Sequence, residues 1–157
     1  MDFTKAKELQ EALDQAILQE LGEGANPKLV EHGLRPRNAG TMQDPDGEAT
    51  RSRACGDAMC IQVRLRGDRV QEIRFMTNGC GPMAACGSMV TELALGSSLR
   101  EAMGIQEQQV MNALQGLPKE ERHCATLAVE TLRAAVRDAL IHRREPWKRL
   151  YRPKSGL

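Results

Sequence analysis

The segment "AMCIQVRLRGDRVQEIRFM" (residues 58–76) constrains the fold most strongly, because its apolar residues recur with a period of two instead of nearly four. The apolar members of its first half are Met59, Ile61, Val63 and Leu65. Ile73 and Phe75 continue the alternation beyond Gly67-Asp68, a pair that is typical of a two-residue II′ turn. The pattern predicts a β-hairpin with one face in solvent, preceded by a weaker strand at residues 48–53.

Helical periodicity flanks this hairpin on both sides. Before it, leucine or isoleucine recurs every fourth residue from Leu9 to Leu21, which predicts an amphipathic helix packed against the core. This helix is expected at residues 3–21. Further helices are expected at residues 27–32, 82–96, 98–103 and 106–114, and in a last segment whose apolar face carries Val129, Leu132, Val136 and Leu140. Strands followed by helices predict an α+β fold, in which helices cover one face of a small three-stranded antiparallel sheet.

The length of 157 residues suits one domain, which we place at residues 1–141. Residues 142–157 are a basic tail that holds the chain's only Trp and its only Tyr. Basic residues interleaved with aromatic ones could bind nucleic acid or an acidic partner. We favour a solvated tail that continues from the last helix, so nucleic acid is not an expected partner.

The amino-terminal sequence and the cysteines indicate the compartment. The segment "MDFTKAKELQEALDQ" lacks the apolar core of a signal peptide, and no apolar run approaches transmembrane length. A membrane partner is therefore not expected. Five cysteines, an odd number spread along the chain, favour reduced thiols in a cytoplasmic protein over a disulfide framework. Reduced cysteines in such a protein would serve in metal binding or in thiol chemistry.

Three cysteines occur where the backbone is expected to leave a strand or loop: Cys55 in "ACGD", Cys80 in "NGCGP" and Cys124 in "RHCA". Neighbouring glycines permit positive φ and leave backbone N–H groups uncovered, so that these groups can approach a thiolate or a sulfide. Cys80 also precedes a predicted helix, whose N-terminal dipole favours the thiolate. Asp57 and His123 become candidate ligands because they lie beside Cys55 and Cys124.

The other two cysteines are interpreted as bystanders. Cys86 lies at helical spacing from Val90 and Leu93, which predicts a small core residue. Cys60 lies on the polar side of the predicted strand, where it would be exposed or would face a partner.

A catalytic Cys-His pair is not expected at His123 and Cys124, because adjacent residues on a helix do not face each other. His32 and His142 lie in segments without a motif. Zinc binding is possible, because Cys, His and Asp side chains are all zinc ligands, although paired C-x2-C knuckles are absent.

The motifs "ACGDAMCIQVRL", "FMTNGCGPMAACGSMVTELALGSSLREA" and "RHCATLAVETLRAAVRDAL" follow one another in an order and spacing that resemble the IscU/NifU-type iron-sulfur cluster assembly scaffold proteins. The loop "HGLRPRNAGTM" resembles the "NPRNVG"-like run that precedes the first cysteine in that family. The resemblance extends over about residues 26–141. It implies a three-stranded antiparallel sheet flanked by helices, in agreement with the periodicity.

The resemblance also implies a role for each candidate residue. Cys55, Cys80 and Cys124 match the sulfur-accepting and cluster-binding cysteines, while Asp57 and His123 match the family's aspartate and histidine. A cysteine desulfurase would supply persulfide sulfur, and a transient [2Fe-2S] cluster would be built and passed to apo iron-sulfur proteins. Such a protein is a carrier and not an enzyme. Asp57 or His123 would be an exchangeable fourth ligand, and zinc could occupy the same site in the isolated protein.

The run before the third cysteine departs from the family pattern. Many members carry "LPPVK", which a dedicated chaperone recognises, whereas this chain has "LPKEERHC". The resemblance therefore does not extend to chaperone-assisted release. The alternative function is a zinc-binding, SufU-like sulfur acceptor that receives persulfide sulfur from a desulfurase. Such proteins resemble this chain in "CATLA", but they usually carry an insertion before the third cysteine and lack the histidine found here.

Overall fold

A computed structural model describes residues 3–21, 25–79 and 81–151. Strands β1 (Gly47–Ser52), β2 (Ala58–Arg66) and β3 (Arg69–Thr77) form an antiparallel sheet in the order β1-β2-β3. The helices are α1 (Phe3–Leu21), α2 (Pro27–Leu34), α3 (Gly81–Ala94), α4 (Leu99–Gly104), α5 (Glu107–Ala113) and α6 (Arg122–Arg144), with 3-10 turns η1 (Lys119–Glu121) and η2 (Pro146–Tyr151). The α+β class predicted from the sequence is confirmed.

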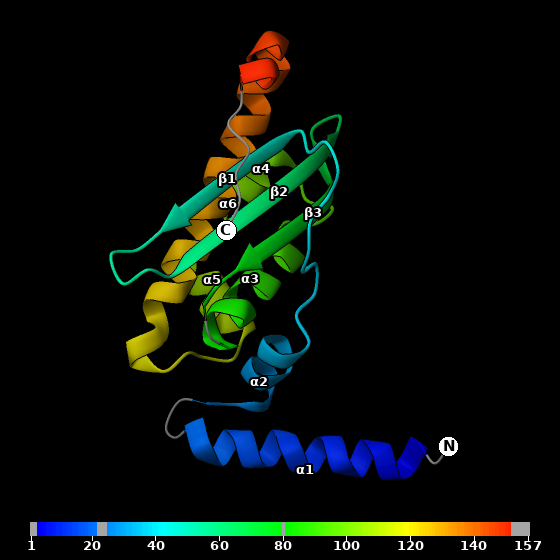
Figure 1. Cartoon of the computed structure of the whole chain (residues 1–157), viewed down its shortest axis with the longest axis vertical. Coiled ribbons are helices and arrows are strands. Elements are labelled where there is room, and N and C mark those ends of the chain that lie inside the picture. Colours follow the sequence, from blue (N-terminus) through cyan, green and yellow to red (C-terminus); the bar gives the residue numbers. More distant parts are fainter. Residues whose placement is uncertain (1–2, 22–24, 80, 152–157) are drawn as a thin grey trace.

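The helices cover one face of the sheet, as Figure 1 shows. Helix α3 packs against β3, and the long α6 packs against β1 and β2. Side chains from strands and helices meet in one core that contains Ile61, Ile73, Met83, Val90 and Leu132, all fully buried. Burial of each such side chain contributes about 1.5–3 kcal/mol relative to exposure. The shared core therefore fixes the positions of α3 and α6 on the sheet.

The hairpin turn forms at Gly67 and Asp68, between β2 and β3, as predicted. Gly67 has a φ of 62°, which the first position of a II′ turn requires and which a larger residue adopts only with strain. The register pairs Ile61 with Phe75 and Val63 with Ile73. Apolar residues of both strands consequently share the side that faces the helices.

The other side of the sheet is less exposed than predicted. Gln62 is buried, because its side-chain oxygen accepts the Met42 N–H at 2.9 Å and its amide donates to Glu48 at 2.6 Å. The loop before β1 thus lies over this part of β2. Cys60 is also buried, between its cross-strand neighbours Thr50 and Met76. The expectation of an exposed Cys60 is wrong, because β2 is the central strand and is covered on both faces.

Helix α1 has the predicted bounds but not the predicted packing. It lies beyond α2, away from the sheet (Figure 1), and it contacts α2 through an ion pair of 3.1 Å between Asp14 and Arg35. Leu9 and Leu13 are 66% and 52% exposed. The stripe stays exposed because α3 and α6 already occupy the face of the sheet. Across the described residues, no helix is long and apolar enough to cross a membrane.

Helix α2 is attached to α3 by a buried polar contact. His32 Nδ1 lies 2.7 Å from Ser88 Oγ, and the same oxygen accepts the Arg37 N–H at 2.8 Å. The Ser88 hydroxyl therefore joins α2 and the segment after it to α3. Burial, and the nearby positive charge of Arg37, lower the pKa of His32 below its ordinary value. His32 is thus a structural histidine, and it lies apart from the cysteine motifs in the sequence.

The last helix runs past the boundary expected at residue 141. Helix α6 continues to Arg144, and His142 is buried within it, 3.4 Å from Asp138. Only then do Glu145 and η2 follow. A separate role for residues 142–157 as a basic tail remains a proposal.

Candidate functional site

The first candidate loop joins β1 to β2 and carries Cys55 at its tip. The Arg53 N–H donates to the Asp57 carbonyl at 2.8 Å, and the Gly56 N–H donates to the Arg53 carbonyl at 2.9 Å. Gly56 has a φ of 96°, a conformation that suits glycine. The tight turn places Cys55 in an exposed position and leaves Asp57 half-buried at the start of β2.

The second loop follows β3 and is bonded to the first. Asn78 accepts the Ala58 N–H at 2.8 Å and donates to the Gly56 carbonyl at 3.1 Å. Thr77 adds a hydroxyl bond of 2.6 Å to the Ala58 carbonyl. Asn78 is therefore a positioning residue that the sequence analysis missed, although it lies inside the "TNGCG" motif. Cys80, the candidate ligand of this loop, lies outside the described residues.

The third candidate segment is the junction of η1 and α6. Cys124 is only 1% exposed, and His123 Nε2 lies 3.6 Å from its sulfur. The same nitrogen lies 4.0 Å from Asp57 Oδ2 on the first loop. Asp57, His123 and Cys124 are thus brought together from segments far apart in the sequence. Cys55 belongs to the same turn as Asp57.

The short distance between His123 and Cys124 corrects the sequence analysis, which expected these neighbours to point apart. His123 Nδ1 lies 2.9 Å from the Glu120 carbonyl, a bond that turns the ring back over the first turn of α6. Because a carbonyl oxygen only accepts, we assign the ring hydrogen to Nδ1. Nε2 then presents its lone pair toward Cys124 and Asp57, which is the form of imidazole that binds metals.

Glu121 is a second residue that the sequence analysis did not identify as part of the site. Its Oε2 accepts from the Cys124 thiol at 3.5 Å. Ligand atoms of Glu121, His123 and Cys124 all lie within 4.8 Å of one another. The spacing of three residues between Glu121 and Cys124 would have been the signal, since such residues share a helix face.

Residues 25–145 match the family model described as the NifU-like N terminal domain. The iron-sulfur cluster assembly scaffold protein IscU 1 of Archaeoglobus fulgidus is 41% identical over 71% of this chain and 73% of its own length. The chain belongs to the IscU/NifU family.

Other relatives support the same family assignment. The scaffold protein IscU of Aquifex aeolicus is 38% identical over 74% of this chain and 76% of its own length. IscU of Escherichia coli is 34% identical over 71% of this chain and 90% of its own length. A NifU-like protein from Brucella abortus has a TM-score of 0.58 at 19% identity, and covers 74% of this chain and 94% of its own. That structural likeness supports the fold alone.

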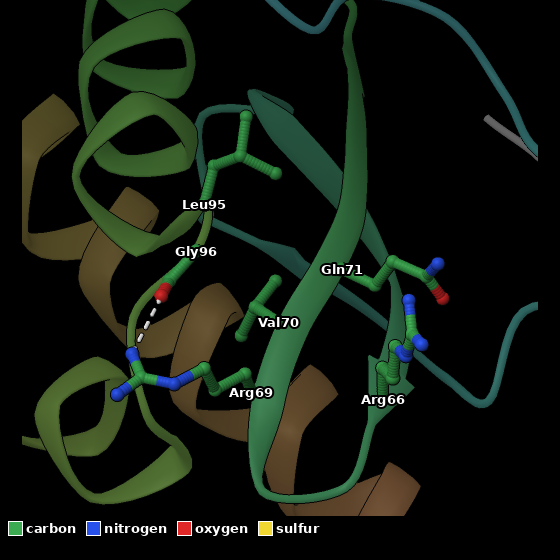
Figure 2. Close-up of a pocket in the computed structure, with 6 residues that line it drawn as sticks. All are labelled: Arg66, Arg69, Val70, Gln71, Leu95 and Gly96. Carbon is green, nitrogen blue, oxygen red and sulfur yellow. Dashed lines mark hydrogen bonds between the residues drawn. The ribbon is translucent and has the colours of Figure 1, made fainter.

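A groove at the hairpin turn is separate from the candidate site of this IscU/NifU member. Figure 2 shows it between the hairpin and the end of α3, with Arg69 donating to the Gly96 carbonyl at 3.0 Å. Its lining residues are Arg66, Arg69, Val70, Gln71, Leu95 and Gly96. Because β2 rises about 3.4 Å per residue, the groove lies about 27 Å from the start of that strand. Of the candidate ligands that the structure describes, Cys55, Asp57, His123 and Cys124, none lines it.

Proposed function

We propose that this protein is a scaffold on which a labile [2Fe-2S] cluster is assembled from iron and desulfurase-supplied sulfur and then passed to apo-proteins. The observation that carries the proposal is the meeting of Asp57 with His123 and Cys124, at 4.0 Å and 3.6 Å from the His123 Nε2 atom. Relatives named as iron-sulfur cluster assembly scaffold proteins support it. On this proposal the chain acts as a carrier and catalyses no reaction itself.

The ligand set explains why a cluster would be held weakly. Permanent iron-sulfur centres are normally bound by four cysteines. Here Cys55, Cys80 and Cys124 would supply three thiolates, and Asp57 or His123 would supply a harder fourth ligand. A carboxylate or imidazole exchanges more readily than a thiolate on iron, so the cluster can leave for a recipient.

Of the two candidate cysteines that the structure describes, Cys55 is the one that a desulfurase would reach without rearrangement of the scaffold, because it is exposed at the loop tip. Cys124 is buried beside His123 and Glu121. We propose that all three candidate cysteines, Cys55, Cys80 and Cys124, can carry sulfur. The exposed position of Cys55 favours it as the first acceptor.

Anaerobic reconstitution tests the proposal. The purified chain is incubated with ferrous iron, cysteine, a cysteine desulfurase and a thiol reductant, which reduces the persulfide sulfur to sulfide, and its visible absorption is recorded after desalting. We expect the absorption of a [2Fe-2S] centre, with iron and sulfide in equal amounts. A colourless protein that holds neither would contradict the scaffold function.

Substitution of Asp57 by alanine is expected to slow cluster loss several-fold. The carboxylate is the ligand that an incoming recipient thiolate displaces most readily, and the remaining softer ligands hold the cluster longer. The measurement is the decay of visible absorption in the presence of an iron chelator. Asp68→Ala, in the hairpin turn at the far end of β2, is the matched control and should behave as the unmodified chain does. Faster loss from Asp57→Ala would contradict the exchangeable-ligand account.

A zinc-binding sulfur acceptor of the SufU type is the second candidate function. The close approach of the Glu121, His123 and Cys124 donor atoms favours it, because zinc binds all three side-chain types. Zinc found in the isolated protein would not separate the two functions, since both use the same site. Formation of a cluster that can be transferred intact would support the scaffold alone.

A further inference from the structure

Glu121 occupies a distinct place beside the cysteine and histidine of the third segment. It ends η1, immediately before α6 begins at Arg122, and its side chain is half-buried. This position directs its carboxylate toward Cys124, whose thiol donates to Oε2 at 3.5 Å.

The distances among these donors fit one tetrahedral ion. With metal–sulfur bonds of about 2.3 Å and metal–oxygen or metal–nitrogen bonds of about 2.1 Å, tetrahedral geometry places a sulfur donor about 3.6 Å from its neighbours. Cys124 Sγ lies 3.5 Å from Glu121 Oε2 and 3.6 Å from His123 Nε2. The two separations from the sulfur are therefore nearly those that a bound ion requires, and the third pair, Glu121 and His123, lies within 4.8 Å.

The orientation of His123 is fixed in the form that binds a cation. Its Nδ1–H is held by the Glu120 carbonyl at 2.9 Å, which leaves the Nε2 lone pair directed into the cluster. Asp57 Oδ2, at 4.0 Å from the same nitrogen, offers a fourth donor. Three donors thus converge at the start of α6, and Asp57 approaches their histidine from the first loop.

The segment before α6 differs from the "LPPVK" pattern at the position of Glu121. In "LPKEERHC" Glu121 stands at the fifth position of the run, where the "LPPVK" motif has a lysine. A lysine ammonium repels a cation and has no lone pair to offer. A carboxylate at the same position adds a negative charge and an oxygen ligand beside Cys124.

We propose that Glu121 is an additional metal ligand, and that Glu121, His123 and Cys124 hold a single divalent cation with Asp57 as the fourth donor. On the proposed scaffold function, on which this role rests, the cation is the ferrous iron that is used for the cluster. The carboxylate and the imidazole suit ferrous iron before sulfide arrives, whereas the thiolates suit the finished cluster.

Titration of the full-length chain with Co²⁺ alone, under anaerobic conditions, tests the inference through the visible absorption of tetrahedral cobalt. Loss of outer-shell partners weakens metal binding by about 10- to 100-fold, so Glu121→Gln, which removes a ligand, should raise the Kd at least about tenfold. Glu130→Gln, the same change at an exposed position further along α6, should leave the Kd within about twofold. Circular dichroism confirms that both variants are folded.

The outcomes separate this inference from the proposed function. An unchanged Kd and spectrum in Glu121→Gln, or no Co²⁺ binding by the unmodified chain, would overturn the ligand role of Glu121. Binding that depends on Glu121 supports the cation site. If the unmodified chain then forms no cluster on reconstitution, the scaffold function fails while the cation site stands.

Discussion

Replacement of Cys124 by serine is expected to lower the amount of [2Fe-2S] cluster bound after reconstitution at least about tenfold, because a serine hydroxyl is a hard and largely protonated ligand at neutral pH. Of the candidate cysteines that the structure describes, Cys124 is the one whose sulfur lies beside a histidine and a glutamate, at 3.6 Å and 3.5 Å. Serine is nearly isosteric, so the fold should persist. The measurement is the visible absorption per protein after desalting.

Cys86→Ala is the matched control for this experiment. Cys86 is fully buried in the core of α3 and has no place in the proposed ligand set. Its truncation should cost about 1–2 kcal/mol of stability and leave cluster assembly intact. Wild-type cluster content in Cys124→Ser would contradict the ligand role, and equal loss in both variants would show that assembly depends on the fold and not on the thiol.

Replacement of Gly47 by valine is expected to lower the free energy of unfolding by about 3 kcal/mol, the upper end of ordinary overpacking costs. A Cβ at Gly47 would lie 2.3 Å from the Ala135 carbonyl oxygen and 2.6 Å from the Ala139 backbone nitrogen. Both are backbone atoms of α6, which cannot move aside as a flexible side chain can. The measurement is urea unfolding followed by circular dichroism.

The same substitution should also lengthen the 4.0 Å distance between Asp57 on the first loop and His123 on α6, because β1 leads into that loop and packs against α6. Gly104→Ala is the control, since a Cβ there meets no atom within 4 Å. Its stability should change by less than about 1 kcal/mol. A Gly47→Val protein as stable as the unmodified chain would show that β1 and α6 separate without cost.

The strands and helices could be predicted from the local pattern of apolar residues. The predictions of burial failed where segments distant in the sequence cover a residue. The alternation in β2 correctly predicts the hairpin, because Ile61 and Val63 face the helices through the period of two alone. The burial of Cys60 and Gln62 depends on the loop at Met42, which no pattern within β2 reveals. Likewise, the stripe of α1 predicts a helix but not what covers it.

The site was predicted in part, for similar reasons. The glycine at position 56 and the residues beside it form the expected turn, which places Asp57 near His123. The approach of His123 to Cys124 depends on one bond to the Glu120 carbonyl. The contact of Glu121 with Cys124 depends on how η1 leads into α6. Rotamers at such a junction are set by tertiary structure, so helical periodicity gave the wrong expectation there.

Transfer of an intact cluster tests the central claim most directly. The chain is reconstituted anaerobically, freed of excess iron and sulfide, and mixed with an apo-ferredoxin in the presence of an iron chelator that competes for released iron. The account predicts that the ferredoxin acquires its [2Fe-2S] spectrum while the absorption of the scaffold falls by an equivalent amount. A ferredoxin that stays colourless while the chelator takes up the iron would contradict it.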